Sequence, residues 1–285
     1  MSHLNIIKTQ LYIGAEHPVR LLHVTDSHLA LADEQDDADL HRLANARAKE
    51  FDGGVDGQTD ALYREALAYA RDNQLTVVHT GDLIDFMSHG NFAYLDRAFD
   101  GVEVLYAAGN HDFCHYVGRA VENADYKWTN MKKVAPHVRD NLWFDSRVIG
   151  GVNLITLDDS YYLISDGQTE MLRAEAAKGL PMVLFMHVPL FTPRHADDRL
   201  KDNPCAYLTA APEDYLARYP EDRRRQQTPD AATLRAVDYI KHEPLIKAIF
   251  AGHTHDNFEE ALTDQLMQYT TDATYHGFVR EILLY

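Results

Sequence analysis

Short apolar runs and longer amphipathic segments alternate along the chain. The apolar runs are too short for helices and are rich in Val, Ile and Leu, so they predict buried strands. They lie at residues 19–24, 75–78, 102–107, 152–157, 182–186 and 245–250.

Apolar residues at helical spacing occur between several of these runs. One helix is predicted after Thr59, and a second begins with Ser165 or Asp166 as its cap. A third opens at Thr228, with Pro229 in its first turn. This alternation of strands and helices indicates an α/β fold.

Residues 258–285 are rich in Thr, Tyr and Val and predict further strands, with turns at 263–264 and near Gly277. Two polar stretches, at about 33–57 and 192–227, interrupt the alternation. We interpret both as surface insertions in one domain over residues 1–285, not as linkers between domains.

Composition and charge narrow the class of protein. Hydrophobic residues make up 46% of the 285 residues, enough for a packed core. Lys and Arg number 27 against 44 Asp and Glu, which gives a net charge of −17. Non-specific binders of nucleic acid or membrane surfaces need clustered Lys and Arg, so this acidity argues against both and leaves metal cations as natural partners.

The sequence also predicts a cytoplasmic location. No apolar run is long enough for a membrane span, and the N-terminal residues show no signal-peptide pattern. Cys114 and Cys205 lie far apart and form no C-x-x-C pair. A reducing compartment is therefore favoured over a structural disulfide.

Side chains that bind metals follow five of the apolar runs. They are Asp26 and His28; Asp82 and Asp85; Asn110, His111 and Asp112; His187; and His253 and His255. Sites in open α/β sheets form where strands end, so we expect these side chains to meet. A glycine directly precedes Asp82, Asn110 and His253, as expected where the backbone turns sharply or approaches a centre closely.

The donor types favour transition metals. Carboxylate, amide and imidazole groups without cysteine suit Mn, Fe or Zn. The donors are too many for one ion, whereas two ions bridged by a carboxylate, roughly 3.5–4 Å apart, commonly serve displacement at phosphorus. His253 and His255 on an extended chain would lie about 6.5 Å apart on one side. That spacing fits one wide site or one ligand to each of two metals.

The ordered motifs D-x-H, GD, GNHD, H and GHxH resemble those of the calcineurin-like metallophosphoesterase superfamily. GNHD, H-x-P and LDDS are most similar to its bacterial cyclic-nucleotide phosphodiesterase-like branch. The resemblance implies a four-layer α/β/β/α sandwich of two mixed sheets, with the site at one edge of both sheets.

The resemblance also implies a role for each motif residue. Asp82 would bridge two metals. The first metal would be held by Asp26, His28 and His255, and the second by Asn110, His187 and His253. His111 would contact the leaving-group oxygen and Asp85 would orient His111. Phe86 stands where the protein Ser/Thr phosphatase branch usually has arginine, which argues against a protein phosphatase.

The expected function is hydrolysis of a small-molecule phosphodiester, similar to a cyclic nucleotide, by hydroxide that bridges the two metals. The leaving group needs a proton, for which His111 is the candidate donor. A phosphomonoesterase or pyrophosphatase acting on a nucleotide or sugar phosphate has the same site chemistry and stays open. A non-catalytic scaffold with this fold is a remote alternative, because it would lack some of the ligands.

Each residue also has an ordinary interpretation. Any one predicted ligand could be a plain strand-end residue, and only the ordered set favours ligation. His23 and His79 are predicted to be packed core histidines, and Asp112 to start a helix or to take part in catalysis. Three further side chains are candidates for substrate contact, against simple packing or surface roles: Arg194, Tyr161 and His89.

Overall fold

The computed structural model describes residues 3–115 and 124–285. Its first sheet has the strand order β1-β11-β2-β3-β4. Strands β11 and β2 pair antiparallel and the other neighbours pair parallel. The strands are β1 (Asn5–Leu11), β11 (Phe278–Leu284), β2 (Val19–Val24), β3 (Thr76–His79) and β4 (Val104–Tyr106).

The second sheet has the order β5-β6-β7-β8-β10-β9. Its four central strands pair parallel, and β5 and β9 are antiparallel edge strands. The strands are β5 (Phe144–Ile149), β6 (Val152–Leu157), β7 (Met182–Met186), β8 (Ile246–Ala251), β10 (Met267–Thr270) and β9 (Phe258–Ala261). Both sheets are therefore mixed.

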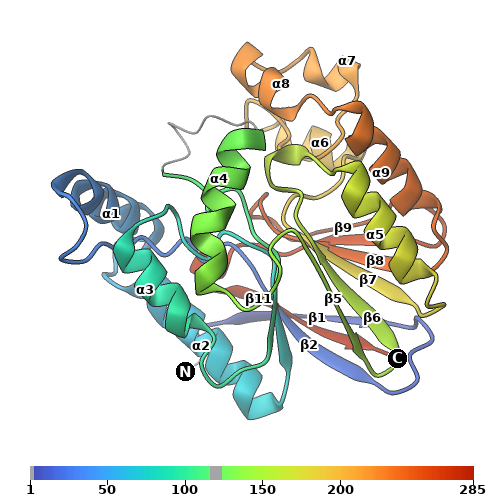
Figure 1. Cartoon of the computed structure of the whole chain (residues 1–285), viewed down its shortest axis with the longest axis horizontal. Coiled ribbons are helices and arrows are strands. Elements are labelled where there is room, and N and C mark those ends of the chain that lie inside the picture. Colours follow the sequence, from blue (N-terminus) through green and yellow to red (C-terminus); the bar gives the residue numbers. More distant parts are fainter. Residues whose placement is uncertain (1–2, 116–123) are drawn as a thin grey trace.

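Helices cover the outer face of each sheet (Figure 1). The first sheet is covered by α2 (Gln58–Asn73), α3 (His89–Ala98) and α4 (Ala124–Val134). The second is covered by α5 (Asp166–Ala176) and α9 (Ala231–His242). This arrangement is the four-layer α/β/β/α sandwich, which confirms the predicted fold class.

The remaining helices belong to the stretches 33–57 and 192–227. Helix α1 (Ala38–Phe51) lies at one end of the molecule (Figure 1). Helices α6 (Pro193–Arg199), α7 (Glu213–Leu216) and α8 (Glu221–Gln227) lie together beside α9. Residues of this second group share a small apolar cluster around Leu208 and Leu216.

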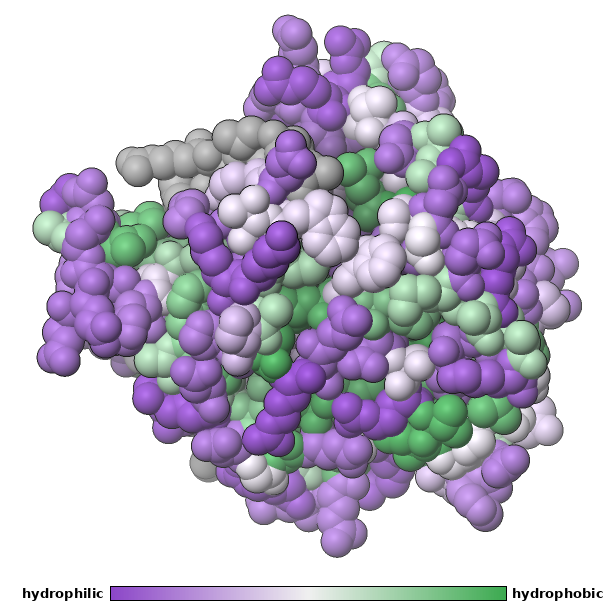
Figure 2. Space-filling model, in the orientation of Figure 1, coloured by the Kyte–Doolittle hydropathy of each residue, from purple (hydrophilic) through white to green (hydrophobic). Residues whose placement is uncertain are grey.

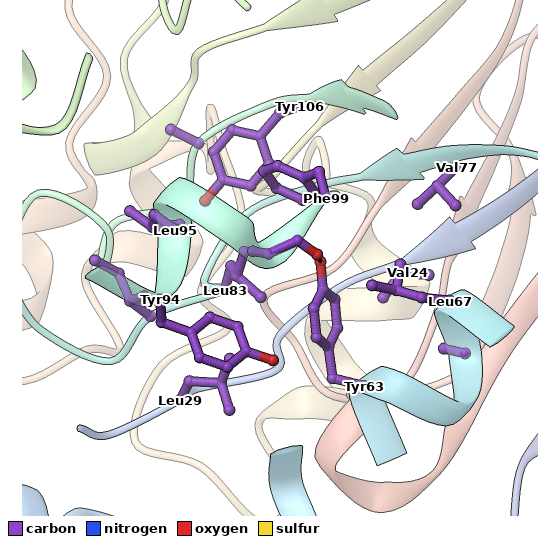
Figure 3. Packing of buried hydrophobic residues seen from close by; sticks show 14 of the residues in the cluster. Val24, Leu29, Tyr63, Leu67, Val77, Leu83, Tyr94, Leu95, Phe99 and Tyr106 are labelled. Carbon is purple, nitrogen blue, oxygen red and sulfur yellow. Dashed lines mark hydrogen bonds between the residues drawn. The ribbon is translucent and has the colours of Figure 1, made fainter. Parts of the chain in front are cut away.

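Strand β2 shows how the sequence fills both interfaces. Side chains of a strand alternate between its faces. Leu21 therefore lies in the core between the two sheets, with Phe185 and Phe250. Leu22 and Val24 lie in the core under the helices, part of which Figure 3 shows around Tyr63 and Leu95.

The sequence located the buried strands well. The observed bounds of β2, β6 and β7 match the predicted runs, and Ser165 caps α5 with a full capping box. The predicted start of α9 is wrong: the helix begins at Ala231, because the side chain of Asp230 accepts a hydrogen bond from the Thr233 N–H. Among the described residues, no helix is long and apolar enough to cross a membrane.

Candidate metal centre

Backbone contacts bring the ends of both sheets together. The Asp26 N–H donates to the Gly81 carbonyl at 3.0 Å, which joins the loops after β2 and β3. The His253 N–H donates to Asp26 Oδ2 at 2.8 Å, which joins the loops after β8 and β2 across the two sheets. The polar strand ends predicted to meet therefore do lie at one edge.

The predicted glycines are sites of close approach. A Cβ atom on Gly252 would overlap Thr25 Oγ1 and Asp26 Oδ2, and one on Gly109 would overlap Asp82 Oδ1. Only glycine allows the backbone this near the carboxylates.

Five of the predicted ligands have left-handed backbone conformations, which non-glycine residues adopt at a cost and mostly near functional sites. The positive φ angles are 50° at Asp26, 47° at His28, 54° at Asp82, 64° at His253 and 49° at His255. The expectation of an extended chain through His253 and His255 is therefore wrong.

One group of donors consists of Asp26, His28 and His255. The Nε2 atom of His255 lies 3.1 Å from Asp26 Oδ1, and that of His28 lies 3.6 Å from the same oxygen. The two Nε2 atoms are 3.3 Å apart. The three side chains could hold one ion.

A second group consists of Asp82, His187 and His253, with Asn110 beside it. The Nε2 atom of His187 lies 3.2 Å from Asp82 Oδ2, 3.2 Å from Asn110 Oδ1 and 3.1 Å from His253 Nδ1. Asp82 Oδ2 is also 3.7 Å from His28 Nε2 in the first group. The Asp82 carboxylate thus lies between the two groups.

Every histidine in the two groups has its other ring nitrogen hydrogen-bonded away from the centre. The partners are Asp85 for His28, the Thr80 carbonyl for His187, Tyr162 for His253 and Tyr275 for His255. Such partners fix the orientation and tautomer of a metal-ligating imidazole. The remaining ring nitrogen of each of the four histidines faces the carboxylates, as a metal site requires.

The electrostatics of the cluster favour cations. Burial lowers the pKa of His187, but the charge of Asp82 and the hydrogen bond to it, together with the charge of Asp26, outweigh burial and raise that pKa to about 10. The pKa of His28 is likewise raised to about 10, because hydrogen bonds to Asp26 and Asp85 outweigh burial. Buried carboxylates thus set a negative potential, and with imidazole nitrogens they form a donor set that suits divalent transition metals.

Asp85 lies at the side of the centre and contacts three cationic or imidazole groups. Its Oδ1 atom is 2.8 Å from His111 Nδ1 and 3.1 Å from His28 Nδ1. Its Oδ2 atom accepts a hydrogen bond of 2.6 Å from Arg47 Nε. Burial raises the pKa of Asp85, but these neighbours outweigh burial and hold it well below its usual value.

Comparison with known proteins agrees with this geometry. The family model described as calcineurin-like phosphoesterase matches residues 19–257. The chain belongs to the calcineurin-like phosphoesterase family. This confirms the predicted superfamily and the enzyme class, a metal-dependent phosphoric ester hydrolase, whereas the cyclic-nucleotide phosphodiesterase-like branch stays a prediction. No curated protein sequence matches the chain.

Several solved structures are similar to the chain at low sequence identity. A dimetal phosphatase from Danio rerio is 15% identical, with a TM-score of 0.50 and coverage of 90% of this chain and 88% of that one. A protein described as a 5′-nucleotidase from Staphylococcus aureus is 11% identical, with a TM-score of 0.45 and coverage of 90% and 49%. The phosphopantetheinyl hydrolase of Mycobacterium tuberculosis is 13% identical, with a TM-score of 0.40 and coverage of 90% of each chain. The phosphoesterase thus spans about half the length of the Staphylococcus protein.

The prediction that Asp112 of this phosphoesterase starts a helix is wrong. Asp112 starts no helix, and its carboxylate accepts hydrogen bonds from the N–H groups of Asp82 at 2.9 Å, Gly109 at 2.7 Å and Ile84 at 3.2 Å. Asp112 therefore ties the loop after β4 to the loop after β3. His23 and His79 are fully buried, as predicted.

The candidate substrate residues of the phosphoesterase have other partners. The Arg194 guanidinium lies over the Phe258 ring, 4.5 Å from its centroid. His89 is half-exposed and hydrogen-bonded to Asp33 at 2.5 Å. Tyr161 is buried, with its hydroxyl 3.3 Å from Cys114 Sγ. These contacts are with Phe258, Asp33 and Cys114, which are not predicted ligands.

Sequence reasoning overlooked Arg47, Phe51 and Tyr275. Phe51 stacks on His28 with ring centroids 4.5 Å apart, and Tyr275 contacts Phe51 at 4.9 Å. Arg47 and Phe51 lie in the stretch interpreted as a surface insertion. Their four-residue spacing on a helix was the available signal, but it gives no indication of which surface that helix covers.

Proposed function

We propose that this phosphoesterase binds two divalent transition metal ions and hydrolyses a small-molecule phosphodiester similar to a cyclic nucleotide. The observation that supports the proposal best is the position of Asp82 between two groups of donors. Each group could hold one ion, and a shared carboxylate is what a two-metal site needs. The two buried cysteines form no disulfide, which favours a cytoplasmic location.

The chain's own residues would bind the ions and handle the proton. Asp26, His28 and His255 would hold the first ion, Asn110, His187 and His253 the second, and Asp82 both. When bound, the ions activate a water and neutralise charge on the phosphate. His111 would protonate the leaving oxygen through Nε2, because Asp85 holds its Nδ1 atom.

Preference for a diester is supported by the surroundings of Arg47. A phosphomonoester carries more negative charge than a diester and gains more from an arginine. The Arg47 guanidinium, which reaches the centre, already pairs with Asp85 and Glu50. With Phe86 at the arginine position of the protein phosphatases, the singly charged diester is the better match.

Hydrolysis of bis-p-nitrophenyl phosphate and of p-nitrophenyl phosphate tests the proposal. Chelator-stripped protein should be inactive, and Mn²⁺ should restore activity that is higher on the diester. Asn110→Ala should lower kcat by more than the roughly 10–100-fold that loss of an outer-shell partner costs. The control is Asn73→Ala, because the Asn73 side chain donates to the Tyr69 carbonyl at the C-terminal end of α2.

The possible outcomes separate the alternatives. A higher rate on the monoester would replace the diesterase proposal by the monoesterase. If titration calorimetry detects no binding of Mn²⁺ by stripped protein, the two-metal proposal fails and the scaffold alternative takes its place.

A further inference from the structure

Helix α1 brings an arginine to Asp85 from a distant part of the chain. We propose that Arg47 is a positioning residue, which holds the Asp85 carboxylate against His111 and His28. Helix α1 would then belong to the catalytic apparatus. The inference deepens the proposed function and rests on it.

The contact between Arg47 and Asp85 is bidentate. Arg47 Nε lies 2.6 Å from Asp85 Oδ2, and Arg47 Nη2 lies 3.0 Å from Asp85 Oδ1. The side chain of Asp85 is 0% exposed and that of Arg47 14%. A two-point contact of this kind fixes the plane of a carboxylate as well as its position.

This fixed plane matters because one oxygen of Asp85 serves two rings. Oδ1 lies 2.8 Å from His111 Nδ1 and 3.1 Å from His28 Nδ1, and His111 Nδ1 also lies 3.0 Å from the backbone carbonyl oxygen of Asp85. Rotation of the carboxylate would weaken both contacts together. Arg47 therefore acts on the proposed proton donor, His111, and on a proposed metal ligand, His28, through a single intermediate.

Phe86 anchors the helix that carries Arg47. Its side chain is fully buried in a cluster with Ala30 and with Ala44 of α1, against which Leu40 and Leu43 pack. Phe86 stands at the position where the protein phosphatases have an arginine. It packs against α1, and α1 supplies Arg47 instead.

Phe51 provides a second anchor for α1. The Arg47 guanidinium lies over the Phe51 ring, 4.6 Å from its centroid, and that ring stacks on His28. Residues 44, 47 and 51 are three and four positions apart, so they share one face of the helix. That face is directed at the centre, whereas Arg42 of the same helix is exposed and pairs with Asp39.

Replacement of Arg47 by methionine should lower kcat about 10–100-fold, the usual cost of losing an outer-shell partner, with KM nearly unchanged. The loss should grow with the pKa of the leaving group, because poor leaving groups depend more on a proton from His111. A series of methyl aryl phosphates measures this dependence. Arg42→Met is the matched control and should behave as wild type in every assay.

A double-mutant cycle tests whether Arg47 acts through Asp85. Adding Arg47→Met to Asp85→Asn should cost little beyond Asp85→Asn alone, because the partner through which Arg47 acts is already changed. Arg47→Lys keeps the charge without the two-point fork and should recover only part of kcat. Arg47→Lys also replaces Arg47→Met as the test variant if Arg47→Met does not fold.

A measurement without turnover separates this inference from the proposed function. In stripped protein the Nδ1–H of His111, which lies near both the carboxylate and the backbone carbonyl of Asp85, should give a downfield proton NMR signal. Arg47→Met should shift or broaden this signal, because the carboxylate is no longer held in place, and Arg42→Met should retain it. An unchanged signal in Arg47→Met would overturn the inference even if the enzyme assay fails. A raised KM with unchanged kcat, or additive losses in the cycle, would also overturn it, since Arg47 would then act directly on substrate or independently of Asp85.

Discussion

Two tyrosine hydroxyls are hydrogen-bonded to ring nitrogens of proposed metal ligands. Tyr162 lies 2.9 Å from His253 Nε2, and Tyr275 lies 3.0 Å from His255 Nδ1. The two tyrosines therefore orient one ligand in each donor group. Because the groups would hold different ions, loss of either hydroxyl should weaken the binding of one ion more than that of the other.

Tyr162→Phe and Tyr275→Phe should each reduce affinity for one of two Mn²⁺ ions by about 10–100-fold. Calorimetric titration of stripped protein measures both affinities. The matched control is Tyr215→Phe, whose hydroxyl bonds the exposed Asp197. Two unchanged affinities in either variant at the centre would show that the hydroxyl does not position its imidazole.

At this scale the sequence predicts which strand-end residues lie near the centre but not what holds them. Asp26, Asp82 and His187 lie within a few residues of the ends of apolar runs, so their location follows from strand periodicity. Tyr275 lies 20 residues beyond His255 along the chain. Arg47 lies in a polar stretch, and only the packing of α1 on Phe86 brings it to Asp85. Such proximity is a tertiary property that no local pattern encodes.

At the scale of elements, the loop after β8 fits against the loop after β2 only because residue 252 lacks a side chain. Replacement of Gly252 by alanine should displace Thr25 and Asp26, which a new Cβ would overlap. We expect loss of metal binding and a decrease of about 1–3 kcal/mol in the free energy of unfolding, as for other overpacked sites.

Gly179→Ala is the control for this change. Gly179 has a φ of +73° and no atom within 4 Å of an added Cβ. It should cost about 1 kcal/mol of backbone strain and leave metal binding intact. Urea unfolding and Mn²⁺ titration of both variants decide the matter: normal metal affinity in Gly252→Ala would refute the close-contact explanation.

The sequence predicts buried elements better than exposed ones. Strands β6 and β7 are buried along their whole length and match the apolar runs, since helices or a second sheet cover both faces. Edge strands β1 and β5 were not predicted, because they pair on one side only and carry polar residues among the apolar ones. The packing of helix α1 on Phe86 was also not predicted, because the few apolar residues of the helix do not indicate which surface they cover.

For the molecule as a whole, a hydrophilic surface contrasts with two histidines that are buried in the core. The face shown in Figure 2 is mostly hydrophilic, with hydrophobic side chains in small patches. Inside, His23 is hydrogen-bonded to the hydroxyls of Thr271 and Thr80. Burial and the positive charge of Arg280 lower the pKa of His23 to about 3, and burial lowers that of His79 to about 3.

These two histidines should make the stripped protein sensitive to acid. An unfolded histidine has a pKa of about 6.5, so between pH 6.5 and 3 the unfolded state takes up protons that the folded state excludes. The free energy of unfolding should therefore fall with falling pH, by up to about 1.4 kcal/mol per pH unit for each histidine.

His23→Gln should make this slope shallower by about 1 kcal/mol per pH unit. Urea unfolding at pH 6.0, 5.0 and 4.5 measures the slope in wild type and variant. His242→Gln is the control, because His242 is exposed. Parallel slopes for wild type and His23→Gln would mean that His23 does not stay neutral in the folded state.

The proposed metal ligands come from both sheets, so bound ions would connect the two sheets. Asp26, Asp82 and Asn110 follow strands of the first sheet, and His187 and His255 follow strands of the second. Cys114 and Cys205 form no disulfide, so no disulfide links the sheets. Bound ions would act as a removable cross-link, closing a loop of 229 residues between Asp26 and His255. A shortage of metal would then loosen the sandwich at the same time as it stops hydrolysis.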